Sequence, residues 1–169
     1  MKKLIMLFLA IALIAGITTN VVAQTATATA GAKIVVASTV ATNTNLHFGT
    51  MSVPSAATTV TVTPLNVRTA AAGIILLPGS PVSSAASYTV TGPSGGTYQI
   101  TLPTSATISN GTPAEDMTVN TFTCSEADLA NAALTATTGA FSVGATLNLV
   151  ISQAPGVYTG NFVVTVTTN

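Results

Sequence analysis

Few side chains in this sequence can act as acids, bases, nucleophiles or metal ligands. Apart from two lysines at the extreme N-terminus and the tyrosines, they are Lys33, His47, Arg68, Glu115, Asp116, Cys124, Glu126 and Asp128. Acid–base or nucleophilic catalysis needs two or three such groups within hydrogen-bonding reach. Only a His47–Cys124 pair is conceivable, and no spacing in the sequence supports it. We therefore expect a protein that is not an enzyme and uses no cofactor.

Two acidic pairs, Glu115-Asp116 and Glu126-x-Asp128, flank an expected strand over residues 117–124. They could hold a calcium ion if their loops met, but neither has the ligand spacing or the turn glycine of a calcium loop. The sequence favours two solvated acidic loops, and we expect no metal site.

His47 and Cys124 have simpler interpretations. His47 lies between Leu46 and Phe48 on an expected strand, so alternation points it away from both and toward solvent. Cys124 is the only cysteine, so an internal disulfide is excluded. We expect it to be a small buried hydrophobic residue, with intermolecular pairing or a reactive thiol as the alternatives. Nearby Glu126 opposes thiolate formation.

The first 23 residues have the pattern of a secretory signal peptide. Lys2 and Lys3 precede an apolar run over residues 4–17 that is shorter than a membrane span, and Ala23 suits the cleavage site. Cleavage after Ala23 would leave residues 24–169 with no transmembrane segment. We expect a bacterial protein that is secreted, at the cell surface or in the periplasm.

The chain expected after cleavage carries two cations against four carboxylates, a net charge of −2. Two cations, Lys33 and Arg68, cannot form a phosphate-binding stripe. This composition excludes nucleic acid as a partner.

Short runs with a period of two, bounded by Gly, Pro, Ser or Asn, fill the rest of the sequence. They predict an all-β protein of about 9–11 short strands, which is typical of an immunoglobulin-like sandwich with Greek-key connections. A closed barrel is the alternative. The expected strands are residues 46–49, 58–65, 73–77, 87–92, 97–103, 106–109, 117–124, 134–137, 146–152 and 157–168. Residues 125–133 could add one helical turn, with Ser125 as its cap.

The tyrosines have structural interpretations. Gly156-Val-Tyr158 precedes the last expected strand and resembles the corner tyrosine of sandwiches, whose hydroxyl ties a loop to the end of a sheet. Tyr88 and Tyr98 have the strand parity of core residues, which favours packing over a sugar-binding platform.

Residues 24–40 form an unusual N-terminal extended segment before a sandwich domain over residues 41–169. The alanines at 26, 28, 30 and 32 share one parity with Ile34, Val36 and Val40, interrupted only by Ser38, while the threonines occupy the other parity. As one strand the segment would reach about 50 Å, far beyond an ordinary strand. It is either a leader or a strand that pairs with another chain.

Several runs carry a resemblance to a known family. They are Leu46-His-Phe-Gly49, Ala86-Ser-Tyr-Thr-Val-Thr-Gly92, Tyr98-Gln-Ile-Thr-Leu-Pro103, Met117-Thr-Val-Asn-Thr-Phe122, Val143-Gly-Ala-Thr-Leu147 and Gln153-Ala-Pro-Gly-Val-Tyr-Thr-Gly160. The chain resembles the secreted bacterial family named domain of unknown function 4402, over nearly all of residues 24–169. That family is in turn similar to the spore coat protein U and archaic chaperone–usher pilin group, whose disulfides this chain cannot form. The resemblance implies an immunoglobulin-like, pilin-like sandwich with a fimbrial or surface-structural role.

These observations favour an exported structural or adhesive subunit that assembles by strand addition, with Ile34, Val36 and Val40 filling pockets of a neighbour. The partners would be further copies, other surface subunits and a periplasmic chaperone. The alternative is a monomeric surface or periplasmic module that binds a glycan or protein through loops 73–87 and 112–116.

Overall fold

The computed structural model describes residues 27–34 and 37–169 and divides into two units, Met1–Ile34 and Val35–Asn169. In the first unit, residues 27–34 have no helix or strand, and all eight residues are exposed. The expected signal peptide over residues 1–23 lies outside the described residues. Within those residues, no helix has the length and apolar character of a membrane span.

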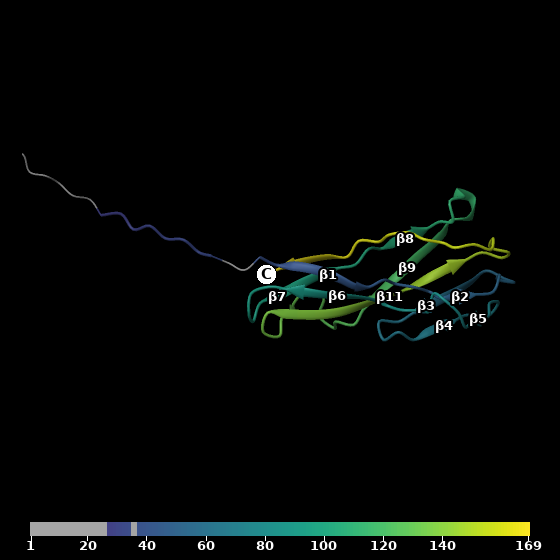
Figure 1. Ribbon diagram of the computed structural model, residues 1–169, viewed down its shortest axis with the longest axis horizontal. Coiled ribbons are helices and arrows are strands. Elements are labelled where there is room, and N and C mark those ends of the chain that lie inside the picture. Colours follow the sequence, from purple (N-terminus) through teal and green to yellow (C-terminus); the bar gives the residue numbers. More distant parts are fainter. Residues whose placement is uncertain (1–26, 35–36) are drawn as a thin grey trace, which may run out of the picture. The chain divides into compact units, whose positions relative to one another are not determined.

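The second unit is built almost entirely from antiparallel strands (Figure 1). They are β1 (Thr39–Thr44), β2 (Thr50–Met51), β3 (Thr58–Val62), β4 (Arg68–Ala70), β5 (Leu76–Leu77), β6 (Ala86–Thr91), β7 (Thr97–Thr101), β8 (Ser105–Ile108), β9 (Met117–Cys124), β10 (Ala132–Ala133), β11 (Thr138–Leu149) and β12 (Thr165–Thr168). A single 3-10 turn, η1 (Pro113–Glu115), is the only helix among the described residues. The all-β prediction is therefore confirmed.

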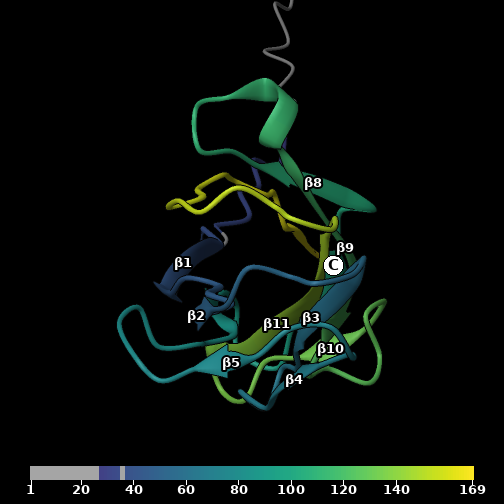
Figure 2. The same cartoon turned by 90° about the vertical axis from the view of Figure 1, so that its right-hand side faces the viewer.

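The strands form a sandwich-like arrangement of separate sheets. The largest has the order β1-β6-β11-β3-β4, and β9 pairs with β11 and with β8. A second sheet has the order β10-β7-β12, and β2 pairs with β5 in a third. Figure 2 shows the C-terminal segment, in yellow, lying above β11 and β3. Since β1 and β12 are unjoined edges of different sheets, the closed-barrel alternative is wrong.

Alternation of apolar and hydroxyl side chains builds the core between the sheets. In β3, Val60 and Val62 are fully buried while the intervening threonine is half-buried, and β6 repeats the pattern with Tyr88 and Val90. β-branched threonines suit such half-exposed strand faces. The core has two clusters, one around Leu147 and one around Phe141, where the Tyr88 ring stacks at 5.0 Å. The prediction that Tyr88 and Tyr98 belong to the core is confirmed.

Several expected element boundaries are wrong. β11 is one continuous strand of twelve residues, where the sequence predicted strands over residues 134–137 and 146–152 separated by a turn. Residues 46–49 contribute one bridge, from His47 to Ser84, instead of a strand. Residues 125–133 form no helical turn, because the Asp128 carboxylate accepts the backbone N–H groups of Ala130 and Asn131 in a local turn.

Candidate functional site

The groups with catalytic or metal-binding potential lie apart. His47 is exposed, as predicted, and its backbone bonds to Ser84, whereas half-buried Cys124 ends β9 opposite Val143. The two acidic pairs lie at opposite ends of the eight residues of β9, about 25 Å apart at strand rise. No cluster of three His, Cys, Asp or Glu side chains that could hold a metal ion exists within residues 27–34 and 37–169.

Burial has the largest effect on the pKa of the Cys124 thiol. Its side chain packs against the Phe141 cluster, and this desolvation raises the pKa of the thiol above its ordinary value of 9.0. The carboxylate of Glu126 raises the pKa further, while hydrogen bonds from the backbone of Glu126 and Ser125 lower it. The side chain is half-buried, so the expectation of a fully buried residue is met in part.

One open pocket, with a lining that is more apolar than polar, has a volume of about 490 Å³. Tyr98, Glu126, Gly139 and several threonines line it. A Cβ added at Gly139 would lie 2.8 Å from the Tyr98 hydroxyl, so the tip of this ring borders the pocket. Its polar groups are hydroxyls and the one carboxylate of Glu126.

A second feature is the open edge between β1 and the C-terminal segment, residues 157–168. We call this edge the groove. All six residues of β1 are exposed, and the strand pairs with β6 along one side only. The C-terminal segment pairs with β7 through Thr165–Thr168 and with Ser109 through Thr159. The predicted strand over residues 157–168 is therefore regular only at its end.

The C-terminal segment keeps the predicted alternation although its strand pairing is incomplete. Tyr158, Phe162, Val164 and Val166 face one way and are half-buried, while the residues between them are exposed. Phe162 contacts Phe122 at 5.0 Å between ring centroids. These four side chains form an apolar stripe that the core covers only in part.

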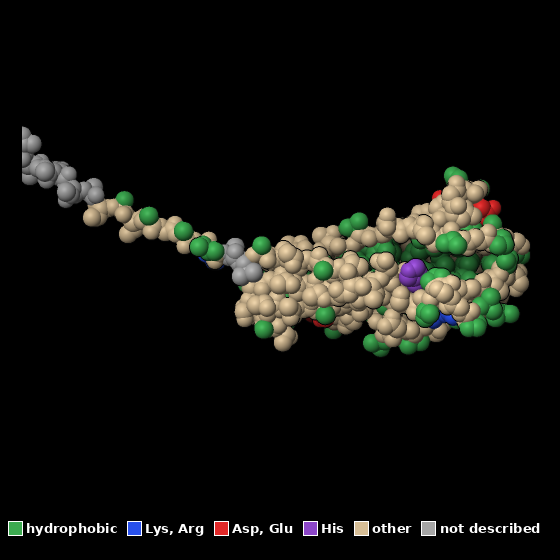
Figure 3. All heavy atoms as spheres, viewed as in Figure 1, with side chains coloured by type: hydrophobic (Ala, Val, Ile, Leu, Met, Phe, Trp, Pro, Cys, Tyr) green, Lys and Arg blue, Asp and Glu red, His purple; other side chains and the backbone are tan. Residues whose placement is uncertain are grey.

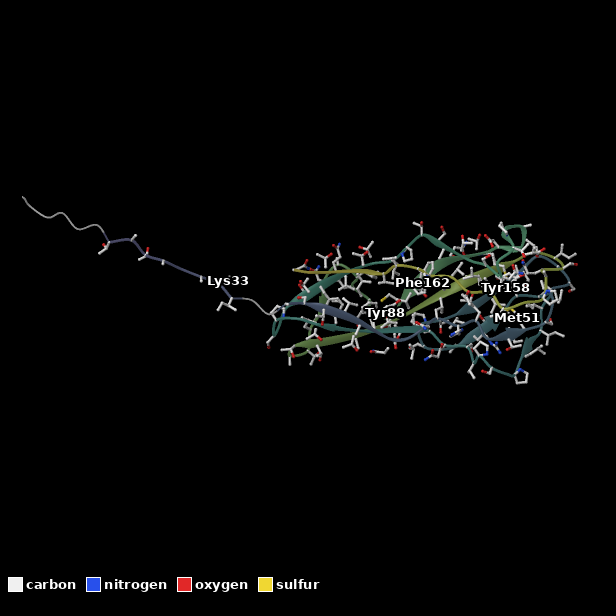
Figure 4. All side chains as sticks on the ribbon, turned by 45° about the horizontal axis from the view of Figure 1, so that its top comes forward. Lys33, Met51, Tyr88, Tyr158 and Phe162 are labelled. Atoms are coloured by element: carbon white, nitrogen blue, oxygen red, sulfur yellow. The ribbon has the colours of Figure 1, made fainter. Side chains whose placement is uncertain are left out.

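Opposite the C-terminal segment, the floor of the groove is formed by residues of β2 and β6. Met51 packs against the same cluster as Tyr158, and Phe162 packs against the cluster that contains Tyr88. Figure 4 shows these pairs across from each other along the unit. Figure 3 shows hydrophobic side chains gathered in a hollow on this face, beside the purple histidine. At one end the groove narrows, because the Ser38 hydroxyl lies 3.2 Å from that of Thr168.

The backbone in the middle of the groove has free hydrogen-bonding groups. Among the described residues, no backbone hydrogen bond joins residues 160–164 to the rest of the chain. On one side the segment touches β8, since a Cβ at Gly160 would meet the carbonyl of Thr107. Its other side faces the groove. An exposed strand edge of this kind can pair with another strand.

Tyr158 anchors the far end of the groove. Its hydroxyl donates to the carbonyl of Ala154 at 2.8 Å and accepts from the Gln153 and Asn110 side-chain amides at 3.2 and 3.3 Å. This is the geometry that a corner tyrosine requires. Gly156 lies in the loop that the hydroxyl spans.

The three residues predicted for strand addition have different positions. Ile34 is 96 % exposed in the first unit, and Val36 lies outside the described residues. Val40 belongs to β1, opposite Val90 of β6, and is 45 % exposed. Sequence reasoning did not find the stripe as a binding surface, because alternation alone does not tell a covered face from an uncovered one.

Comparison with known proteins gives one match. The model of a family described as a domain of unknown function (DUF4402) matches residues 38–167. No curated protein and no solved structure matches the chain.

Proposed function

The chain belongs to the DUF4402 family, and we propose that it is an exported structural or adhesive subunit that assembles by strand addition. In this proposal the N-terminal segment of one copy fills the groove of another. The observation that carries the proposal is the half-buried stripe of Tyr158, Phe162, Val164 and Val166 beside a backbone with free hydrogen-bonding groups. The expected signal peptide supports the placement at the cell surface or in the periplasm.

Two kinds of interaction remain unmade in the groove, and an added strand would supply both. Residues 160–164 offer main-chain donors and acceptors, and each backbone hydrogen bond that a strand supplies contributes about 1 kcal/mol net. The stripe offers apolar surface, and burial of one large aliphatic side chain against it contributes about 1.5–3 kcal/mol. An extended peptide with one apolar face meets both needs.

Residues 25–34 have the properties of such a peptide. Alanines at 26, 28, 30 and 32 and then Ile34 occupy one face, which is small and apolar. Three threonines, Gly31 and Lys33 occupy the other. In the described part of this segment no regular structure satisfies the backbone, and every side chain is exposed. Its ten residues span about 33 Å as a strand, which equals the length of residues 158–167.

Small side chains suit a groove whose wall already contains large ones. Tyr158, Phe162 and the valines project from the C-terminal segment, so a strand with alanines can approach closely, and Ile34 can fill a wider position. Val40 then belongs to the acceptor, since β1 forms one wall of the groove.

The test compares residues 24–169 with the same chain lacking residues 24–37. Light scattering and negative-stain microscopy should show polymers of the first and only monomers or irregular aggregates of the second. Ordered filaments from the truncated chain would overturn the proposal. A monomer in both forms would also overturn it, and would favour a segment that remains on its own domain or unattached.

Two point variants test the proposal without the truncation, which could itself cause misfolding. Ile34→Asp places a charge on the apolar face of the segment, and Thr27→Asp places the same charge on its hydroxyl face. Only Ile34→Asp should abolish polymers, because burial of an unpaired carboxylate is costly. Both variants leave the folded domain unchanged, which circular dichroism should verify.

The second candidate function is a binding module, and the pocket beside Tyr98 and Glu126 favours it. Hydroxyl groups and one carboxylate are suited to a glycan. A glycan array probed with residues 24–169 tests this role, and binding that disappears in Glu126→Gln would support it. Absence of any reproducible glycan would count against it.

A further inference from the structure

We propose that Asn110 is a self-modification site, at which the backbone nitrogen of Gly111 attacks the Asn110 side-chain amide and converts it, through a cyclic imide, into a carboxylate. The modification changes the corner that Tyr158 holds. It needs no reactant other than water, and it does not depend on strand addition.

Asn110 and Gly111 lie in the loop between β8 and η1, which projects from the unit in Figure 2. Asn110 is the only asparagine in the sequence that a glycine follows directly. Gly111 is exposed and has a φ of 93°, and a Cβ added there would meet nothing within 4 Å beyond its chain neighbours. A glycine nitrogen has no side chain beside it to hinder its approach to a neighbouring carbon. The new bond to the Asn110 Cγ closes a small ring within one chain, so the two reacting atoms are always near each other.

Each reacting atom has a hydrogen-bond partner suited to its part in the reaction. The Gly111 N–H donates to the Ser109 hydroxyl oxygen at 3.1 Å, which can pass the released proton to water. The Asn110 Oδ1 accepts from the Thr112 N–H at 2.9 Å, and this donor stabilises the negative charge that the oxygen gains during the attack. The Asn110 Nδ2 lies 3.3 Å from the Tyr158 hydroxyl, which can supply a proton to the departing nitrogen. The loop therefore holds the amide beside groups that assist each step.

The reaction is balanced with water as its only co-reactant. The bond from the Gly111 nitrogen to the Asn110 Cγ forms as that nitrogen loses its proton, and the bond from Cγ to Nδ2 breaks, which releases ammonia. Water then adds to one of the carbonyl carbons of the imide ring. Addition at Cγ yields aspartate, and addition at the backbone carbonyl carbon yields isoaspartate, in which the main chain runs through the former side chain. Nothing is oxidised or reduced.

The products weaken the corner at the end of the groove. Both lack the Nδ2 donor, so the Tyr158 hydroxyl keeps only the Ala154 carbonyl and the Gln153 amide as partners. Both also add a negative charge beside this hydroxyl. A Cβ added at Gly156 would lie 3.6 Å from the Asn110 side chain, so the corner loop packs directly on the group that changes. We expect the modified chain to be less stable than the original one.

Peptide-mapping mass spectrometry of folded residues 24–169, incubated at neutral pH, tests the reaction. Asn110 should gain the mass that corresponds to exchange of NH2 for OH, at least as fast as in a synthetic peptide of residues 105–116, while the other asparagines stay unchanged. Ser109→Ala should slow the conversion about fivefold, the value of one hydrogen bond. Ser105→Ala, which removes an exposed hydroxyl at the start of β8, should not slow it. Slower conversion in the folded chain than in the peptide would overturn the inference, and so would equal rates in the two serine variants.

Urea unfolding tests the effect on the corner. Asn110→Asp reproduces one product and should lower the urea midpoint, and incubated wild type should acquire the same lower midpoint as its Asn110 converts. Asn45→Asp is the matched control, because it adds the same charge at an exposed side chain that has no hydrogen bond among the described residues. Its midpoint should not fall. Equal midpoints of the two variants would show that conversion of Asn110 leaves the corner intact, which would overturn the proposed effect.

Discussion

At the residue scale, the polar side chains with the most partners hold loops together. The Arg68 guanidinium donates hydrogen bonds to three backbone carbonyls. Gly49, with a φ of 74°, leaves room for this guanidinium, because a Cβ at position 49 would collide with it. Tyr158 similarly joins Asn110, Gln153 and Ala154. These interactions give the ends of the sandwich fixed loops without a disulfide.

Removing the Tyr158 hydroxyl should destabilise the domain. Tyr158→Phe leaves the carbonyl of Ala154 without its donor and the Asn110 amide without its acceptor, which costs about 1–3 kcal/mol. The Gln153 amide keeps only the carbonyl of Glu115 as its acceptor. Urea unfolding followed by circular dichroism measures the change. Tyr88→Phe is the control, because the Tyr88 hydroxyl has no hydrogen bond among the described residues. A similar loss in both variants would show that the hydrogen bonds of Tyr158 contribute little.

The Cys124 thiol should make stability depend on alkaline pH. Burial raises its pKa in the folded chain, so the folded chain keeps a proton that the unfolded chain releases. The stabilisation is complete below pH 9.0 and declines as pH rises through the raised pKa.

The urea midpoint of the wild type should therefore fall more between pH 8 and pH 10 than that of Cys124→Ala. Burial also raises the pKa of Tyr88 and Tyr98 above 10.0, and this effect is common to both proteins. Equal shifts in the two proteins would contradict the role of the thiol.

Local patterns predicted some of these residues and missed others. Tyr158 was accessible from the sequence because the glycine, the tyrosine and the following alternation are adjacent. The role of Arg68 could not be predicted from the sequence, because its three carbonyl partners belong to residues 48, 50 and 77, which only the folded chain brings together. The uncovered stripe was missed for the same reason, because its burial depends on β1 and β6.

At the element scale, β11 organises the larger sheet. It pairs with β6 along its first half, with β3 along its second half and with β9 on its other edge. The sequence analysis placed no strand over residues 138–145, a stretch that contains glycines at 139 and 144. Both instead allow close approach within a strand: Gly139 accommodates the Tyr98 ring, and Gly144 accommodates the backbone of residues 62–64.

Gly144→Ala should therefore be strongly destabilising. The added methyl would meet the carbonyl of Val62 and lie 2.7–2.8 Å from backbone atoms of Thr63 and Pro64, which cannot rotate away as a side chain would. We expect a loss of about 2–3 kcal/mol in the free energy of unfolding, measured with urea. Gly156→Ala is the control, because its added methyl would make only ordinary contacts of 3.6–3.7 Å. Equal stability of the two variants would contradict the close approach.

At the scale of the whole molecule, a nearly uncharged surface and an open strand edge are the two features that support the proposed assembly. The four carboxylates and two cations that follow the expected cleavage site give little repulsion between copies. The all-β class followed from the period-two runs. The open edge could not be predicted, because it results from the placement of β1 and β12 in different sheets.

Hydrogen exchange should locate the site of assembly within the whole molecule. In the chain lacking residues 24–37, amides of residues 160–164 should exchange rapidly, since no backbone partner protects them among the described residues. In polymers of residues 24–169 the inserted strand would pair with them, and their exchange should slow at least about 100-fold, as for hydrogen-bonded strand amides that open rarely. Amides of β11 paired with β3 provide an internal control that should stay slow in both samples. Protection that appeared elsewhere, while residues 160–164 still exchanged rapidly in the polymer, would place the contact between copies outside the groove.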